Sequence, residues 1–163
     1  MPVFYSAVEV IEMAIKTEES GKIFYDEVAK KTDNKDLKQL FEFLAGEEVK
    51  HKQIFSDLYQ TIKDSPQTIP YNWEEMGLYL KAITESKFFL GEGKAINLVK
   101  EANTSEQALE FALGFERDTM LFYTEIMSIV ADKNQELVSK IVAQEKSHIR
   151  QLQEMKEKMI KGN

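Results

Sequence analysis

The sequence predicts an all-α protein, a four-helix bundle built from two αα-hairpins joined by a long connection. Three observations predict this fold class. The prolines are Pro2, Pro66 and Pro70, so the stretches 3–65 and 71–163 contain none, which suits long helices. Apolar residues recur at alternating steps of three and four along four segments, a pattern typical of the seam of a helical bundle. The two halves of the chain also resemble each other.

The apolar period predicts four long helices, at about 3–31, 36–63, 105–131 and 134–161. The polar turn sequences TDNK and ADKN separate the two helices of each hairpin. Thr104 with Gln107, and Asp132 with Gln135, have the spacing of capping boxes. These pairs predict the starts of the third and fourth long helices.

Residues 64–103 form a crossover between the second and third long helices. Turns at Pro66 and Pro70 open it, and the segment YNWEEMGLYLKAITESKFF predicts one shorter helix within it. We expect this helix to pack over the bundle as a lid. One long connection allows the second and third long helices to run parallel, whereas an antiparallel bundle needs only a short turn there.

Each apolar seam is interrupted near its middle by ionisable residues. They are Glu18 in the first long helix, Glu48 and His51 in the second, Glu116 in the third, and Glu145 and His148 in the fourth. Burying such groups among leucines costs several kcal/mol unless something compensates. Glu18 lies about as far before the first hairpin turn as Glu48 lies after it, so the two are level along the bundle at about 1.5 Å per residue.

An internal repeat relates the two hairpins. Residues 18–25 read EESGKIFY and residues 116–123 read ERDTMLFY. Residues 47–54 read EEVKHKQI and residues 144–151 read QEKSHIRQ. The repeat predicts two hairpins related by an approximate two-fold axis, with equivalent residues meeting near it.

The repeat also selects which acids belong to the buried set. The second copy has Gln144 where the first has Glu47, so Glu48 is the repeated acid of the second helix. In the first helix, Glu18 rather than Glu19 aligns with Glu116 of the second copy.

Four glutamates and two histidines converging on the bundle interior predict a dinuclear metal site. Buried carboxylates cannot all stay ionised side by side without positive charge, and two divalent cations balance four of them. Residues three apart share a helix face, so each E-x-x-H pair can reach one metal. Imidazole with carboxylate suits iron or manganese, while ligand type alone leaves zinc open. The alternative is a buried polar network without metal, but both histidines of the chain fall in these pairs.

The ligand pattern of ferritin-like di-iron carboxylate proteins is one glutamate from each of two helices and an E-x-x-H pair from each of the other two. This sequence has the same pattern. The segments EESGKIFYDEVA, LAGEEVKHKQIF and VAQEKSHIRQLQEM resemble the rubrerythrin branch, and the resemblance covers nearly the whole chain, 1–163, as a single ferritin-like domain. It implies two iron ions, which manganese or zinc can replace. It also implies terminal ligands Glu18 and Glu116, bridging ligands Glu48 and Glu145, one histidine per iron (His51 and His148), and Tyr25 and Tyr123 as neighbours of the site.

Two features depart from the rubrerythrin pattern. Rubrerythrins carry a rubredoxin domain with a cysteine-bound iron, but this chain ends after the fourth long helix and has no cysteine. We therefore expect its electrons to come from a separate protein. Rubrerythrins also have an extra glutamate three residues after the third-helix ligand, which helps an iron move during peroxide turnover. Here that position is Thr119 and its counterpart is Gly21, which argues for a more symmetric site and against efficient peroxidase chemistry.

Three functions are compatible with such a site. The first is an oxidoreductase that reduces peroxide or dioxygen, with the metals as Lewis acids and redox centres. The second is ferritin-type iron oxidation and storage, which uses the same ligand pattern. We expect no fifth helix after residues 162–163 and a long, helical connection at 64–103, and both expectations argue against a ferritin. The third is a bundle stabilised by metal that binds a partner. The rubrerythrin-like motifs favour the first.

The composition of the chain argues against several classes of binding partner. A formal charge of −7 argues against nucleic acid and anionic membranes. The absence of cysteine excludes disulfides and cysteine-ligated metal. No signal peptide pattern opens the chain, and no apolar run approaches the roughly 18 residues of a membrane span. We expect a cytoplasmic homodimer whose partners are a small oxidant and an electron-donor protein.

Overall fold

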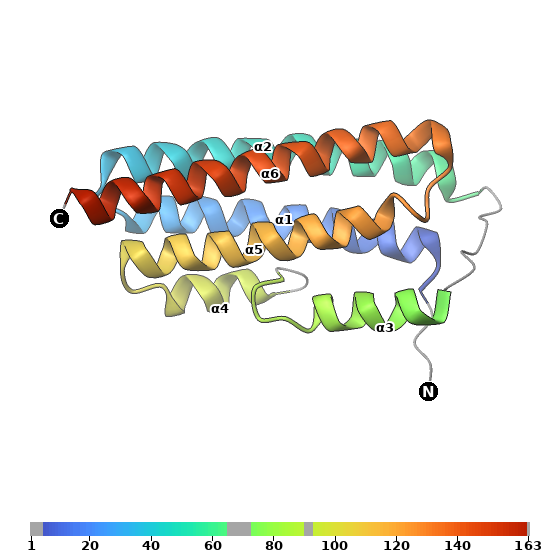
Figure 1. Ribbon diagram of the computed structural model, residues 1–163, viewed down its shortest axis with the longest axis horizontal. Coiled ribbons are helices and arrows are strands. Elements are labelled where there is room, and N and C mark those ends of the chain that lie inside the picture. Colours follow the sequence, from blue (N-terminus) through green and yellow to red (C-terminus); the bar gives the residue numbers. More distant parts are fainter. Residues whose placement is uncertain (1–4, 65–72, 90–92, 163) are drawn as a thin grey trace.

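The computed structural model describes residues 5–64, 73–89 and 93–162. Over these residues the chain is helical, and the helices are α1 (Ala7–Lys31), α2 (Lys35–Ile62), α3 (Trp73–Thr84), α4 (Lys94–Glu101), α5 (Ser105–Ile126) and α6 (Asp132–Lys161). The axes of the four long helices are roughly parallel, and α2 and α5 run in the same direction (Figure 1). The predicted all-α bundle with a long crossover is confirmed. None of the described helices combines the length and apolarity needed to cross a membrane.

Local sequence explains most helix starts. A capping box of Ser6 with Glu9 starts α1 at Ala7, so the predicted start near residue 3 is too early. The side chain of Asn34 accepts a hydrogen bond from the backbone N–H of Leu37 at the start of α2. The predicted capping box of Thr104 with Gln107 starts α5 and is confirmed.

The turn between α5 and α6 differs from its prediction. Helix α5 ends at Ile126 rather than at residue 131, because the amides of Ser128 and Ile129 bond to carbonyls three residues earlier and tighten the chain into a turn. Helix α6 begins at Asp132 rather than at 134, with Ala131 as an N-cap that offers no side-chain hydrogen bond. The capping box predicted for Asp132 is therefore wrong. Its carboxylate lies in the first helical turn instead, where negative charge favours the helix dipole.

The crossover contains two described helices rather than one. Helix α3 ends at Thr84, before the end of the segment predicted to be helical, and α4 begins after Gly93, whose φ is +79°. The predicted turns at Pro66 and Pro70 lie outside the described residues. Helix α3 packs on α5 and α4 packs on α1 (Figure 1). The buried residues Met76, Leu80, Ile83 and Phe89 place this part of the crossover over the bundle, as expected.

The core consists of two apolar clusters. One joins the N-terminal half of α1 to the C-terminal ends of α2 and α5 and to α3. The other joins the C-terminal half of α1 to the starts of α2 and α5 and to α4. The buried acids and histidines of the four long helices belong to neither cluster, so a polar layer divides the core.

Candidate metal centre

The polar layer contains all six predicted ligand residues. Helix α1 supplies Glu18, α2 supplies Glu48 and His51, α5 supplies Glu116, and α6 supplies Glu145 and His148. Each of these residues is at most 2% exposed. The seam positions therefore meet inside the bundle, as the apolar period and the repeat predicted.

Among the described residues, three groups of buried donor atoms could hold a cation; one joins Glu47 to both histidines, and the other two consist of the six predicted ligand residues. Of these two, one contains Glu18, Glu48 and His51, and the other contains Glu48, Glu116, Glu145 and His148, with the donor atoms of each group within 4.8 Å of one another. Glu48 belongs to both groups. Glu145 also spans the layer, because Oε1 lies 3.1 Å from Nδ1 of His51 and Oε2 lies 2.9 Å from Nδ1 of His148. Both acids thus occupy positions suited to carboxylates that bridge two ions.

Most of the inward-facing donor atoms lack a hydrogen-bond partner among the described residues. These atoms are Oε2 of Glu18, both carboxylate oxygens of Glu48 and Oε2 of Glu116. Nδ1 of His51 and Oε1 of Glu145 also take part in no hydrogen bond, although they face each other as an ion pair at 3.1 Å. Buried polar atoms without partners are rare because each carries a desolvation penalty. Here they come from one layer and are the donor types that bind iron, manganese and zinc. The residues present therefore fit a pair of metal ions.

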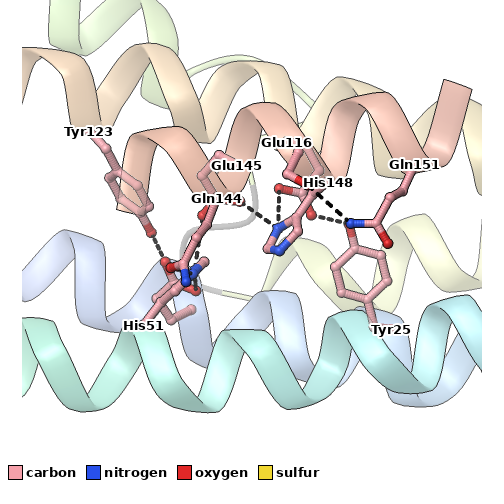
Figure 2. Close-up of polar contacts among 10 residues, drawn as sticks. Tyr25, His51, Glu116, Tyr123, Gln144, Glu145, His148 and Gln151 are labelled. Atoms are coloured by element: carbon pink, nitrogen blue, oxygen red, sulfur yellow. Dashed lines mark hydrogen bonds and ion pairs between the residues drawn. The ribbon is translucent and has the colours of Figure 1, made fainter. Parts of the chain in front are cut away.

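Two tyrosines hold the terminal carboxylates in place. The hydroxyl of Tyr25 donates to Oε1 of Glu116, and the hydroxyl of Tyr123 donates to Oε1 of Glu18. Each tyrosine therefore reaches the glutamate of the opposite hairpin, and Figure 2 shows the two rings at opposite ends of the layer. Each hydroxyl engages Oε1, so the second carboxylate oxygen, Oε2, faces a histidine. Oε2 of Glu18 lies 3.7 Å from Nδ1 of His51, and Oε2 of Glu116 lies 3.6 Å from Nδ1 of His148.

Gln144 contacts a histidine on the side away from the metal groups, a role that the sequence did not indicate. Nε2 of His51 lies 2.9 Å from Oε1 of Gln144 (Figure 2). An amide oxygen can only accept, so Nε2 carries the hydrogen and Nδ1 is the nitrogen that faces the metal groups. Glu47, the repeat counterpart of Gln144, is also buried and close to both histidines, and Lys50 binds its carboxylate. The repeat aligned these two residues but gave no sign that they contact histidines.

The carboxylates of the layer share protons unequally. Burial raises the pKa of Glu48 well above its ordinary value, and repulsion from Glu18 adds to this effect. Burial, together with the neighbouring Glu145, raises the pKa of Glu116 to about 8. The pKa of Glu145 itself is lowered, because hydrogen bonding from Glu116 and the histidines outweighs its burial.

The histidines are protonated in the metal-free protein. Burial lowers the pKa of both, but the adjoining carboxylates outweigh it, raising the pKa of His51 to about 11 and that of His148 to about 10. Burial and the neighbouring glutamates also raise the pKa values of Tyr25 and Tyr123 well above 10. The tyrosines therefore remain neutral hydrogen-bond donors at physiological pH.

Metal binding is expected to release about four protons per chain near pH 7, because coordination requires deprotonated ligands. The protons come from Glu48, Glu116, His51 and His148, whose pKa values all lie above their ordinary values. Titration of weakly buffered, metal-free protein with Zn²⁺ in the presence of a pH indicator measures this number. Release of about one proton or fewer would contradict the protonation pattern.

The comparisons with known proteins agree with this geometry. The family model Rubrerythrin matches residues 9–156. A candidate ferritin-like diiron-carboxylate protein of Thermotoga maritima, known from a crystal structure, is 25% identical, with a TM-score of 0.69 over 95% of this chain and 97% of its own. A hypothetical protein of Pyrococcus furiosus has a TM-score of 0.68 at 20% identity, covering 98% of this chain and 93% of its own. No curated protein matches the chain.

These likenesses confirm the predicted ferritin-like fold. The family match spans α1 to α6 and includes every residue of the buried Glu/His layer. On that evidence, the chain belongs to the rubrerythrin family.

Proposed function

We propose that the protein is a non-haem di-iron oxidoreductase that reduces peroxide or dioxygen. One observation carries the proposal: among the described residues, inward-facing carboxylate oxygens of Glu18, Glu48 and Glu116 lack hydrogen-bond partners, in a layer whose glutamates and histidines form overlapping groups that could hold metal ions. When bound, two ferrous ions would supply two electrons, which with two protons convert one hydrogen peroxide into two waters. The Glu/His composition of the layer supports iron over calcium or magnesium, which prefer oxygen ligands alone.

The protein groups around the layer have distinct tasks in this proposal. Glu18, Glu48, Glu116, Glu145 and both histidines hold the ions. Tyr25 and Tyr123 fix the orientation of the terminal carboxylates through their hydroxyl groups. The two apolar clusters on either side of the layer exclude bulk water. We further propose that a separate protein returns the electrons, since the chain has no cysteine to bind a rubredoxin-type iron.

The test is metal content and oxidation by peroxide. Metal-free protein, loaded with ferrous iron without air, should bind two irons per chain and show a near-ultraviolet absorbance band after one equivalent of peroxide. Iron that binds but does not react with peroxide or dioxygen would refute an oxidoreductase. Continued uptake of many irons per chain, in a large assembly by light scattering, would instead support storage.

A further inference from the structure

One buried hydroxyl of the polar layer has no role in the site described so far. Thr119 is fully buried, and its Oγ1 has no hydrogen-bond partner among the described residues. It lies three residues after Glu116 and four before Tyr123, both of which face the layer. Residues at these spacings share a helix face, so Thr119 faces the layer as well.

Other helical threonines of this chain satisfy their hydroxyls within their own helix. Thr17, which is equally buried, donates to the carbonyl of Met13 at 2.8 Å, and Thr124 donates to that of Met120 at 2.8 Å. This bond to the carbonyl four residues earlier is the usual choice for threonine in a helix. Thr119 does not make the equivalent bond to Phe115. Its hydroxyl is therefore not satisfied by its own helix.

The repeat shows what lies next to this position. Gly21 is the counterpart of Thr119, and a Cβ at Gly21 would lie 3.0 Å from Oε2 of Glu48. The repeat therefore predicts that Thr119 lies near Glu145, the counterpart of Glu48. Thr119 makes no hydrogen bond to that carboxylate: its Oγ1 has no partner among the described residues, and the two oxygens of Glu145 lie 3.1 Å and 2.9 Å from Nδ1 of His51 and of His148.

The two sides of the layer differ in what covers them. At Gly21 the ring of Phe115 closes the space, because a Cβ there would lie only 2.7 Å from Cζ of the ring. The repeat counterpart of Phe115 is Thr17, a much smaller side chain. The Gly21 side is thus closed by the ring of Phe115, while on the Thr119 side the residue that corresponds to this ring is Thr17 and the hydroxyl of Thr119 has no partner among the described residues.

We infer that Thr119 is a positioning residue that hydrogen-bonds, through its hydroxyl, a small anionic or peroxide ligand bound at the metal pair. The inference rests on the proposed function and specifies which side of the layer receives the oxidant. A hydroxyl can both donate and accept, so it suits a ligand that carries lone pairs and, when protonated, a hydrogen. The side closed by Phe115 offers no such group.

Azide is the probe, and the test compares variants of matched burial. Di-ferric protein is titrated with azide, followed by its charge-transfer absorbance, for the parent, Thr119→Val, Thr119→Ser and the control Thr17→Val. Loss of one hydrogen bond to a charged ligand weakens azide binding about tenfold or more in Thr119→Val. Thr119→Ser, which keeps the hydroxyl, and Thr17→Val should stay within about twofold of the parent.

The stability of the metal-free variants provides an independent readout. Thr119→Val removes an unpartnered hydroxyl, so its unfolding temperature should equal or exceed that of the parent. Thr17→Val removes a satisfied hydroxyl and should unfold at a lower temperature. A threonine that serves packing alone would not combine unchanged stability with weakened azide binding.

Each remaining outcome overturns the inference. Equal azide affinity in the parent and Thr119→Val, or no azide binding by the parent, removes the assigned role while leaving the proposed function intact. Weaker iron binding in Thr119→Val with unchanged azide affinity would mean that the hydroxyl supports Glu145 instead. Failure of the parent to bind iron overturns the proposed function together with this inference.

Discussion

Loading the protein with two divalent cations should raise its unfolding temperature by about 15 °C or more, because ions that bind only the folded state stabilise it by mass action. At a free concentration about 1,000 times the dissociation constant, each ion contributes about 4 kcal/mol. For a domain of this size, 1 kcal/mol shifts the midpoint by about 2–4 °C. The six donor residues come from four different helices, so an unfolded chain cannot reproduce the site.

Rising pH should lower the stability of the metal-free protein and raise the increment that metal adds to it. The pKa of Glu116 is raised to about 8, that of His148 to about 10 and that of His51 to about 11. A group whose pKa is raised by folding stabilises the fold below its unfolded pKa, and this contribution is lost as pH rises through the folded value. Metal-free protein should therefore become less stable from about pH 6 to about pH 9. The increment from metal should grow over the same range, because protons compete with the ions.

Calorimetry of metal-free and Zn²⁺-loaded protein at several pH values in this range checks both trends. Mg²⁺ serves as a control, because a cation that prefers oxygen ligands should stabilise this Glu/His layer far less. Metal-free protein that gains stability with rising pH would contradict the assigned protonation. A shift by Zn²⁺ no larger than that by Mg²⁺ would contradict a dedicated metal site.

The residues of the buried Glu/His layer could be selected from sequence because two independent signals coincide on them. The helical period placed them on the buried seam, and the repeat chose between adjacent acids. The structure shows the consequence for one such pair: Glu18 is fully buried, whereas Glu19 is exposed and forms an ion pair with Lys52 at 2.9 Å. The helical period alone does not separate these neighbours, because each is an acid next to the seam, and the repeat is the signal that selects Glu18.

Contacts between the hairpins were beyond the sequence argument. Tyr25 and Tyr123 were expected near the site, but the repeat does not show that each binds the glutamate of the other hairpin. That arrangement depends on how the two hairpins cross, which the periodicity within each helix does not contain. The contact of Gln144 with His51 has the same origin. Helix α5 ends early because of backbone hydrogen bonds made within the turn. The apolar period continues through Val130 and therefore did not predict this end.

Replacing Glu48 by glutamine should separate metal binding from folding. Burial and repulsion from Glu18 raise the pKa of Glu48 well above its ordinary value, so the metal-free fold favours the neutral form of this side chain. Glutamine has nearly the same shape as the neutral acid, and the unfolding free energy of the metal-free variant should change by less than about 1 kcal/mol. A neutral amide cannot supply the negative charge between two cations, and the affinity for metal should fall by at least about 100-fold.

The matched control is Glu42→Gln, an exposed acid of the same helix. Titration calorimetry with Zn²⁺ and metal analysis after gel filtration should find two ions per chain in the control and at most one in Glu48→Gln. Thermal unfolding of both metal-free variants should match the parent. Two tightly bound ions in Glu48→Gln would show that Glu48 is no ligand, and a strongly destabilised metal-free variant would show that its carboxyl group serves the fold. Because glutamine imitates the metal-free state of Glu48 and not its ionised form, only a metal ligand gives loss of binding without loss of stability.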